Sequence, residues 1–362
     1  MHQDATYWIA LANLTDPGQL RKLYHHFPDG ASAWQAPAHE LQTLGLTKVT
    51  AEQLKINQEK QPPEVYATKL EAAGIQAITI TDPNYPSRLK EIYDAPVVLF
   101  YSGALPTTNE LALAIVGTRR FSQYAKTVTL QLTRALARSN IVIVSGLARG
   151  IDGLVHEATL EVGGRTTAVL GSSIREADIY PGEHRNLASR IVRTGGLILS
   201  EYPPGVGPAK HHFPARNRII AGLTKGTLVI EAPERSGALI TARQALEYNR
   251  EVMAVPGPIF EPNSVGGNDL IKLGARVVTS VDDILEALQL ERTQPQPTRT
   301  INTLSTSEQT VLAALTKQPL HIDELCNRTA LTLTELLSTM SMLEMKDFVR
   351  DIGGKNFIRL AH

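Results

Sequence analysis

The chain has 362 residues, of which 43% are hydrophobic, 20% charged and 5% aromatic. This length predicts about two or three domains, and the composition favours a soluble α/β protein over a disordered chain. The formal net charge is zero, so a uniformly basic surface is excluded and any nucleic-acid site requires local segregation of charge. Because Cys326 is the only cysteine, an internal disulfide is excluded, and we expect neither a metal site nor a cofactor. No apolar run reaches about 18 residues, so we expect a cytoplasmic protein without membrane association.

The amino-terminal part, residues 1–70, has helix-spaced apolar residues separated by Gly and Pro turn signals, which predicts a small helical domain. The pieces Leu14–Phe27 and Ala38–Leu46 resemble degenerate helix-hairpin-helix, or SAM-like, units. The Gly-x-Gly hairpin that would present N–H groups to a DNA phosphate is missing. We therefore expect a packing or protein-contact domain that has lost this DNA role, with a retained DNA role as the alternative.

The pattern of apolar runs in residues 71–290 predicts an α/β core. Apolar, strand-like runs end at regular intervals of 25 to 30 residues, at Gly117, Gly146, Gly171, Glu201, Glu231 and Gly257. Such spacing is typical of βαβ units, so we expect a Rossmann-like, mostly parallel sheet with helices on both faces and ligands at the carboxyl ends of its strands. The segment 77–103 supplies two further candidates for edge strands.

The carboxyl-terminal part predicts a linker followed by a winged helix. Residues 291–304 are polar and contain Pro, as linkers do. Residues 305–362 contain three helix-like stretches and then the hairpin signal Gly353-Gly354 between two β-prone runs. The expected recognition helix, 331–345, carries Glu335 and Glu344 but no Lys or Arg, which favours a protein-contact surface over a DNA reader.

A glycine-bracketed turn follows the strand-like run 141–145. Gly146 and Gly150 lack a Cβ, so the backbone of this turn could approach a ligand closely. Asp152 is the expected N-cap of the next helix, whose first turn would favour a phosphate. Considered alone, the turn could equally be an empty connection.

Charge is segregated within the core, and the glycine turns lie in its basic half. Residues 116–220 contain fourteen Lys or Arg against seven Asp or Glu, whereas residues 221–290 contain six against nine. Gly117-Thr118-Arg119-Arg120 ends one strand with two adjacent arginines. A structural salt bridge is the alternative for Arg119, but two arginines beside two glycine turns favour phosphate binding.

The run 210–218 combines cations, an aromatic ring and an amide. Lys210, Arg216 and Arg218 could follow a phosphate backbone, Phe213 could stack on an exposed base, and Asn217 could bond a base edge or sugar. A core position for Phe213 is the alternative. The two adjacent histidines, His211 and His212, lack a third ligand at useful spacing for a metal.

Seven motifs carry a family resemblance: GTRR at 117, SGLARGID at 145, AVLG with YPGEHRNL within 168–187, LSEYPPG at 199, KHHFPARNRIIAGL at 210, EAPERSGALITARQAL at 231 and AVPGP at 254. In this order they resemble the DNA processing protein A family, DprA, also called Smf. The resemblance implies single-stranded DNA binding in natural transformation, loading of the RecA recombinase, and a homodimer, for which residues 221–290 are our candidate contact region. It implies these DNA-contact positions: Gly117, Thr118, Arg119, Ser145, Gly146, Gly150, Lys210, Phe213, Arg216, Asn217 and Arg218.

Two enzyme classes compete with a binding protein. A dinucleotide enzyme is disfavoured because the turn at 146–150 reads GLARG and lacks the GxGxxG fingerprint. A nucleotide-hydrolysing enzyme of the lysine-decarboxylase-like, or LOG, group remains the alternative, because Gly226-Thr227 followed by Glu231 resembles part of that group's GGxGTxxE motif. The preceding glycine pair is replaced by Thr224-Lys225, so we expect no enzymatic activity, and we expect Glu231, Ser236 and Thr241 to organise the end of the sheet or a subunit contact.

Overall fold

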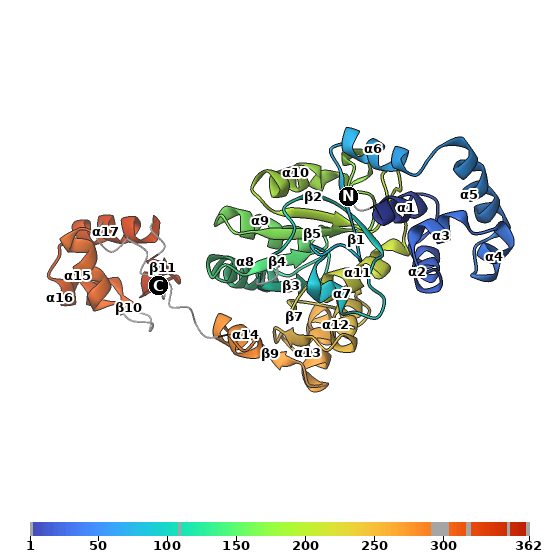
Figure 1. Ribbon diagram of the computed structural model, residues 1–362. Coiled ribbons are helices and arrows are strands. Elements are labelled where there is room, and N and C mark those ends of the chain that lie inside the picture. Colours follow the sequence, from blue (N-terminus) through green and yellow to red (C-terminus); the bar gives the residue numbers. More distant parts are fainter. Residues whose placement is uncertain (1–2, 108–109, 291–303, 316–319, 346–347, 360–362) are drawn as a thin grey trace. The chain divides into compact units, whose positions relative to one another are not determined.

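The computed structural model describes residues 3–107, 110–290, 304–315, 320–345 and 348–359 (Figure 1). The chain forms two compact units, Met1–Arg292 and Thr293–His362. The predicted boundary at residue 70 stays a prediction, and the predicted linker 291–304 lies, except for Leu304, outside the described residues.

The first unit is built on a sheet of nine strands within the described residues. In spatial order they are β1 (Gln76–Thr79), β2 (Val98–Gly103), β6 (Leu197–Ser200), β5 (Thr166–Leu170), β4 (Val142–Ser145), β3 (Ala112–Val116), β7 (Gly226–Val229), β8 (Glu251–Ala254) and β9 (Arg276–Val277). From β6 to β9 all neighbours pair in parallel, and Ala114 of β3 aligns with Val144 on one side and Thr227 on the other. β2 pairs antiparallel with both β1 and β6. The expected parallel sheet with two extra edge strands is confirmed, whereas β9 was not anticipated.

Helices cover both faces of this sheet (Figure 1). Alternate residues of each buried strand point to opposite faces, so Leu113 and Ile115 pack with α8 (Gln123–Arg138), α9 (Ile151–Glu161) and α14 (Val281–Ala287). Ala114 and Val116 face the other layer, which contains α7 (Ser87–Lys90), α11 (His212–Gly222) and α12 (Gly237–Glu247). The remaining helices of the core are α10 (Arg185–Arg193), α13 (Val265–Lys272) and the short 3-10 turns Glu176–Asp178, Gly182–His184 and Pro262–Ser264.

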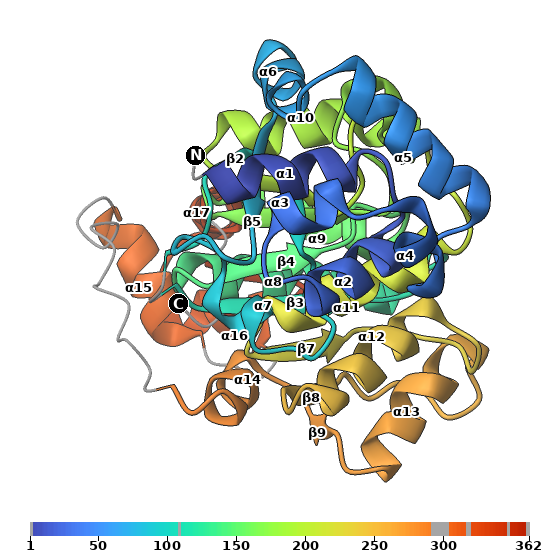
Figure 2. The ribbon, with the colours of Figure 1, turned by 45° about the vertical axis from the view of Figure 1, so that its right-hand side comes forward.

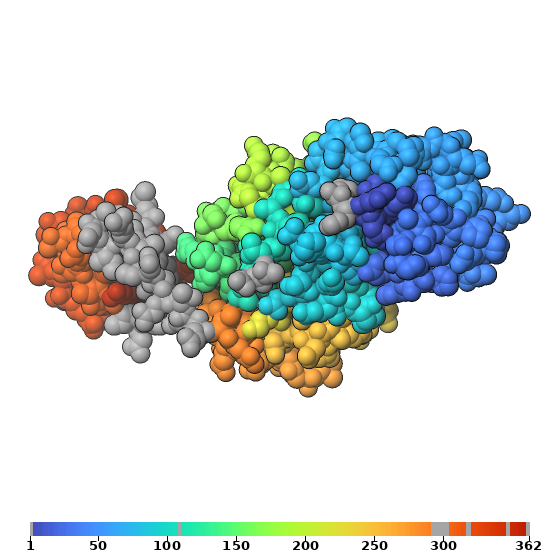
Figure 3. All heavy atoms as spheres, in the orientation of Figure 1, coloured from blue at the N-terminus to red at the C-terminus, as the bar shows by residue number. Residues whose placement is uncertain are grey.

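The amino-terminal segment is helical, as expected, and contains α1 (Gln3–Ala12), α2 (Pro17–His26), α3 (Gly30–Gln35), α4 (Ala38–Thr43), α5 (Lys48–Lys60) and α6 (Glu64–Ala72). Asp16 and Asp29 begin α2 and α3 by accepting hydrogen bonds from backbone N–H groups of the first turn. The segment lies against the β1–β2 edge of the sheet (Figure 2), and the two form a continuous surface (Figure 3).

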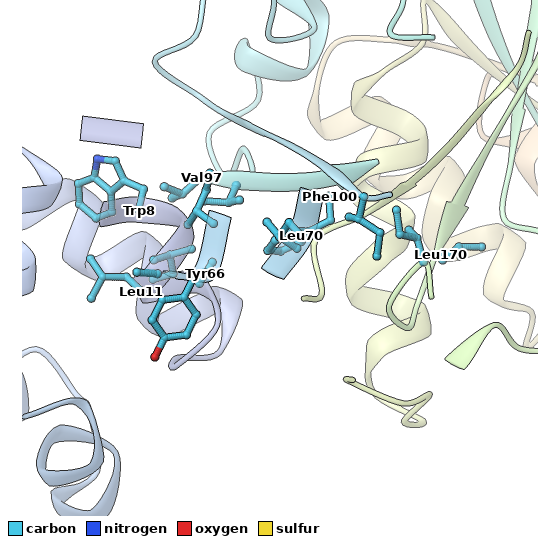
Figure 4. Packing of buried hydrophobic residues seen from close by; sticks show 14 of the residues in the cluster. Trp8, Leu11, Tyr66, Leu70, Val97, Phe100 and Leu170 are labelled. Carbon is cyan, nitrogen blue, oxygen red and sulfur yellow. The ribbon is translucent and has the colours of Figure 1, made fainter. Parts of the chain in front are cut away.

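One hydrophobic cluster joins this segment to the sheet. Trp8 and Leu11 of α1 belong to the same cluster as Phe100 of β2 and Leu170 of β5, with Leu70 of α6 between them (Figure 4). Separating the helices from the sheet would therefore expose apolar surface on both sides.

The second unit has its own core and is a winged helix. It contains α15 (Thr306–Ala314), β10 (Leu320–His321), α16 (Ile322–Thr329), α17 (Leu333–Met345), β11 (Val349–Asp351) and β12 (Asn356–Arg359). β11 and β12 form the expected antiparallel wing, and Gly353 and Gly354 turn between them with φ of 97° and 63°, where a Cβ would be strained. β10 pairs with β12 and was not anticipated.

Candidate nucleic-acid interface

A cavity of about 760 Å³ opens at the carboxyl edge of the first unit's sheet. The chain runs from β3 through β4 and β5 to β6 on one side, and then crosses back to β7 on the other side of β3. Such a switch point is where open parallel sheets bind ligands, because the flanking loops diverge there. The cavity is lined by residues that include Gly117, Thr118, Arg119, Arg120, Asp152, Tyr180, Lys210, Phe213, Arg216, Asn217, Arg235, Ser236, Thr241 and Asn263.

The loops after β3 and β4 touch backbone to backbone beside this cavity. Gly150 has a φ of 87°, and a Cβ built on it would lie 2.4 Å from the carbonyl oxygen of Thr118. The N–H of Ile151 donates to that same oxygen at 3.2 Å. The positive φ and the clash of a Cβ with the Thr118 carbonyl oxygen both require glycine at position 150. The hydrogen bond from Ile151 holds the two loops together.

The expected N-cap role of Asp152 is wrong. The helix α9 begins after Gly150, and Asp152 lies inside its first turn, where it is buried. Its Oδ2 accepts a hydrogen bond from the N–H of Gly146 at 3.1 Å, so the carboxylate closes the glycine turn instead of the helix end. Burial raises the pKa of Asp152, and the nearby Arg216 guanidinium opposes that rise.

Exposed cations and an aromatic ring share the rim of the cavity. The Arg119 guanidinium lies 5.8 Å from the centre of the half-buried Phe213 ring, and that ring lies 5.6 Å from the ring of Tyr180. Lys210 is exposed on the same rim. In the part of the chain that the structure describes, Arg119 and Lys210 have no carboxylate within salt-bridge distance, so the alternative of a structural ion pair for Arg119 finds no partner.

Arg216 lies beneath this rim and is only 4% exposed. Its Nη1 donates to the carbonyl oxygen of Gly146 at 2.6 Å and also to that of Val169. Gly146 follows β4, and Val169 is the next-to-last residue of β5, so one guanidinium links the ends of two neighbouring strands. Burial lowers the pKa of Arg216 to about 10, and the Asp152 carboxylate opposes that shift. The side chain carries positive charge at the floor of the cavity and is held by protein groups.

Asn217 also lines the cavity, and its Nδ2 donates to the carbonyl oxygen of Gly237 at 3.2 Å. Arg218 does not line it: its Nη2 donates to Glu201 Oε1 at 2.6 Å, and its Nε lies 3.6 Å from Asp94 Oδ2. Ser145 is buried within β4 and donates to the carbonyl oxygen of Ile115 at 2.7 Å. Of the eleven predicted positions, the structure gathers Gly117, Thr118, Arg119, Lys210, Phe213, Arg216 and Asn217 around the cavity, with Gly146 and Gly150 behind them.

Arg120, which the sequence indicated as a phosphate-binding arginine, lines this cavity, whereas five other lining residues were not among the predicted contact positions: Tyr180, Arg235, Ser236, Thr241 and Asn263. Two of them carried a usable signal, because Tyr180 lies in the YPGEHRNL motif and Ser236 is a typical N-cap residue, which it is for α12. Asn263 had none, since its role depends on a hydrogen bond from its Nδ2 to the carbonyl oxygen of Arg120, 143 positions away.

Glu231 organises the end of the sheet, as expected. Its carbonyl oxygen accepts from the N–H of Thr118 at 2.8 Å, and its Oε2 accepts from the N–H of Ser122 at 2.9 Å. Gly226 and Thr227 begin β7 and therefore lie at the opposite, amino edge of the sheet from the cavity. Within the described residues, no cluster of side chains is suited to a metal ion and no helix is long and apolar enough to span a membrane.

Comparisons with known proteins agree with this architecture. The family described as DNA recombination-mediator protein A matches residues 76–289, and the DprA winged helix domain matches residues 295–355. The DNA processing protein DprA of Bacillus subtilis (strain 168) is 42% identical over 264 residues, which cover 70% of this chain and 88% of that protein.

Two solved structures are also similar. The X-ray structure of DprA from Streptococcus pneumoniae has a TM-score of 0.65 at 36% identity and covers 77% of this chain and 95% of its own. A structure of DNA processing protein A from Helicobacter pylori, described for its single-stranded DNA binding mode, has a TM-score of 0.52 at 31% identity, over 60% of this chain and 97% of that one. The chain therefore belongs to the DNA recombination-mediator protein A family, also called DprA or Smf.

Proposed function

We propose that this protein binds single-stranded DNA in the cytoplasm, without enzymatic activity, and passes the strand to the RecA recombinase during natural transformation. The observation that carries the proposal is the rim of the cavity, where Arg119 and Lys210 lack carboxylate partners in the described chain and Phe213 offers a ring face beside Arg119. A single strand presents what this rim accepts: phosphates for the cations and unpaired bases for the ring. The printed description of the Helicobacter pylori relative, a single-stranded DNA binding mode, supports it.

Phosphate and stacking contacts carry little sequence information, so binding should be nearly sequence-independent and strongly dependent on salt. The test is fluorescence anisotropy of a labelled oligo-dT, titrated with the protein at several salt concentrations between about 50 and 200 mM. We expect a linear fall of log affinity with log salt concentration. A flat response would contradict the proposed phosphate contacts.

The rival activity, nucleotide hydrolysis, has a direct test. Purified protein is incubated with nucleoside 5′-monophosphates, and release of free base is followed by chromatography. We expect none, because the Gly226-Thr227 pair that suggested this activity lies at the amino edge of the sheet and does not line the cavity. Release of base at a rate that depends on protein concentration would overturn the non-enzymatic proposal.

We further propose a homodimer that uses residues 221–290. A groove of about 420 Å³ between α12 and α13 is lined by apolar side chains together with charged ones, and its Leu246 and Leu273 are strongly exposed. Exposed apolar grooves of this kind are common at protein contacts. Sedimentation at micromolar concentration should give a dimer, and Leu273→Glu should shift it towards monomer. A wild-type protein that sediments only as monomer would contradict this proposal.

A further inference from the structure

A turn with two exposed apolar residues lies outside the cavity just described. The N–H of Glu261 donates to the carbonyl oxygen of Pro258 at 3.1 Å, which closes a β-turn with Ile259 and Phe260 at its corners. Ile259 is 77% exposed and Phe260 is 93% exposed. Turn corners are usually Gly, Pro, Asn, Asp or Ser, because polar or conformationally adapted residues suit an exposed bend. An Ile-Phe pair there leaves a large apolar surface in water.

The turn is held in a defined position. Below it, the side-chain amide of Asn268 accepts from the N–H of Gly257 at 3.2 Å and donates to the Gly257 carbonyl oxygen at 3.0 Å. Pro256, Pro258 and Pro262 restrict the backbone on both sides of the turn. The exposure of Phe260 is therefore a property of an ordered turn, in which the ring is presented with little backbone freedom.

Two hydrogen bonds connect the residues on either side of this turn to the loop that follows β3 and to the first turn of α8. The Nδ2 of Asn263 donates to the carbonyl oxygen of Arg120 at 2.8 Å. The Tyr124 hydroxyl donates to the carbonyl oxygen of Pro256 at 3.0 Å. Arg120 and Asn263 both line the cavity, so the turn adjoins its rim on the side of Arg120.

The loop after β3 and the first turn of α8 bring more aromatic surface to this side. Phe121 and Tyr124 are both partly exposed, and Arg120 is an exposed cation without a carboxylate partner in the described residues. The arrangement repeats the chemistry of the first site, where Arg119 accompanies Phe213. Proteins that hold single strands combine cations along the backbone with rings for successive bases.

We propose that Phe260, together with Phe121 and Tyr124, forms a second base-stacking platform that continues the path of the single strand from Phe213 past Arg120. This inference rests on the proposed function and adds to it a second subsite for bases. The acidic Glu261 next to Phe260 disfavours a phosphate at the tip of the turn, so the turn supplies stacking and Arg120 supplies the charge.

The test compares oligo-dT of about 5 and about 16 nucleotides, lengths that span the range of typical single-strand sites. Phe260→Ala should weaken binding of the longer strand by about fivefold or more and leave the shorter strand and the salt slope unchanged, because a stacking contact is lost. Phe213→Ala should weaken both strands. As a matched control, Tyr93→Ala removes an aromatic side chain that is 71% exposed and does not line the cavity, and it should change neither affinity.

The results distinguish a failure of the proposed single-strand binding from a failure of the second stacking platform alone. If Phe213→Ala and Arg119→Ala leave both strands bound as tightly as before, the proposed function itself fails. If those variants weaken binding but Phe260→Ala leaves both affinities unchanged, only the second platform is overturned. If Phe260→Ala changes the sedimentation coefficient and not the affinity, the turn is a protein contact, which also overturns the inference.

A fluorescent variant gives a readout that general destabilisation would not mimic. Phe260→Trp preserves a stacking face, and the native Trp8 and Trp34 are both buried. The new indole should be quenched by the longer oligo-dT and not by the shorter one, because only the longer strand reaches it. Equal quenching by both lengths, or none, would contradict a platform at the far end of the path.

Discussion

The two halves of the run 210–218 have similar residues and opposite surroundings. Lys210 and Phe213 lie on the rim of the cavity, and no carboxylate of the described chain pairs with Lys210. Arg216 and Arg218 are buried, and each donates to defined protein oxygens. Clustered cations in a sequence therefore do not by themselves form a ligand site. Cations with internal partners stabilise the framework, and those without them are available to a phosphate.

The largest expected effect tests the framework side. Arg218→Ala leaves Glu201 buried without its partner, so we expect a loss of about 3–5 kcal/mol in the free energy of unfolding. Urea denaturation measures this loss, and Arg218→Ala combined with Glu201→Gln should recover part of it. If Arg218→Ala leaves stability intact and lowers the salt slope of DNA binding, then Arg218 is a contact residue and the comparison fails.

On the rim, Phe213→Ala should weaken binding of single strands by about 1–3 kcal/mol, because one stacking face is removed. The salt slope should stay the same, since no charge is lost, and Phe213→Trp should preserve affinity. Anisotropy titrations across a salt series measure both quantities. A changed slope would mean that the ring positions Arg119 and does not stack on a base.

His156 allows a pH test of the buried framework. It is fully buried, and its Nδ1 lies 2.7 Å from the Thr166 hydroxyl, which itself donates to the carbonyl oxygen of Ile143. Burial, with smaller contributions from His184 and Arg216, lowers the pKa of His156 to about 3. The folded protein keeps this ring neutral, whereas the unfolded chain binds a proton below about pH 6.5.

Stability from His156 is therefore present above about pH 6.5 and is lost as pH falls towards 3. We expect a loss of about 2 kcal/mol in unfolding free energy between about pH 7 and pH 5. Urea denaturation at each pH measures it, and His156→Gln should be less stable at pH 7 but should lack this part of the slope. The same slope in both proteins would assign the acid sensitivity to other groups.

The smallest effects belong to single rim cations. Arg119→Ala and Lys210→Ala should each lower the salt slope of single-strand binding by about 0.7, because one phosphate contact is lost. Thermal stability should change little, since neither side chain has an ion-pair partner in the described residues. If Arg119→Ala unfolds the protein while the folded fraction binds normally, Arg119 is structural and the site is misplaced.

Much of the fold could be predicted because the buried strands of four or five residues are apolar runs, and each run is followed by a glycine or an acidic residue. The strands that escaped, β9 and β10, have two residues each and are defined by backbone pairing, which leaves no side-chain pattern. The meeting of Arg119 with Lys210 and Phe213 could be expected because parallel strands end at one edge. The burial of Arg216 and Arg218 could not be predicted from the sequence. Their hydrogen-bond and ion-pair partners lie in distant segments: Gly146, Val169, Glu201 and Asp94.

The close backbone contact between Gly150 and Thr118 has a consequence for the ligand. Because these two loops hold each other in place, the site cannot change its shape when a strand binds. The loss of conformational entropy on binding therefore falls on the nucleic acid. The bases of an adenine tract stack on one another in solution and must unstack before the strand can bind at this site, whereas the bases of a thymine tract are largely unstacked already. We therefore expect oligo-dT to bind more tightly than oligo-dA of equal length, a preference set by the stiffness of the strand and not by recognition of its bases.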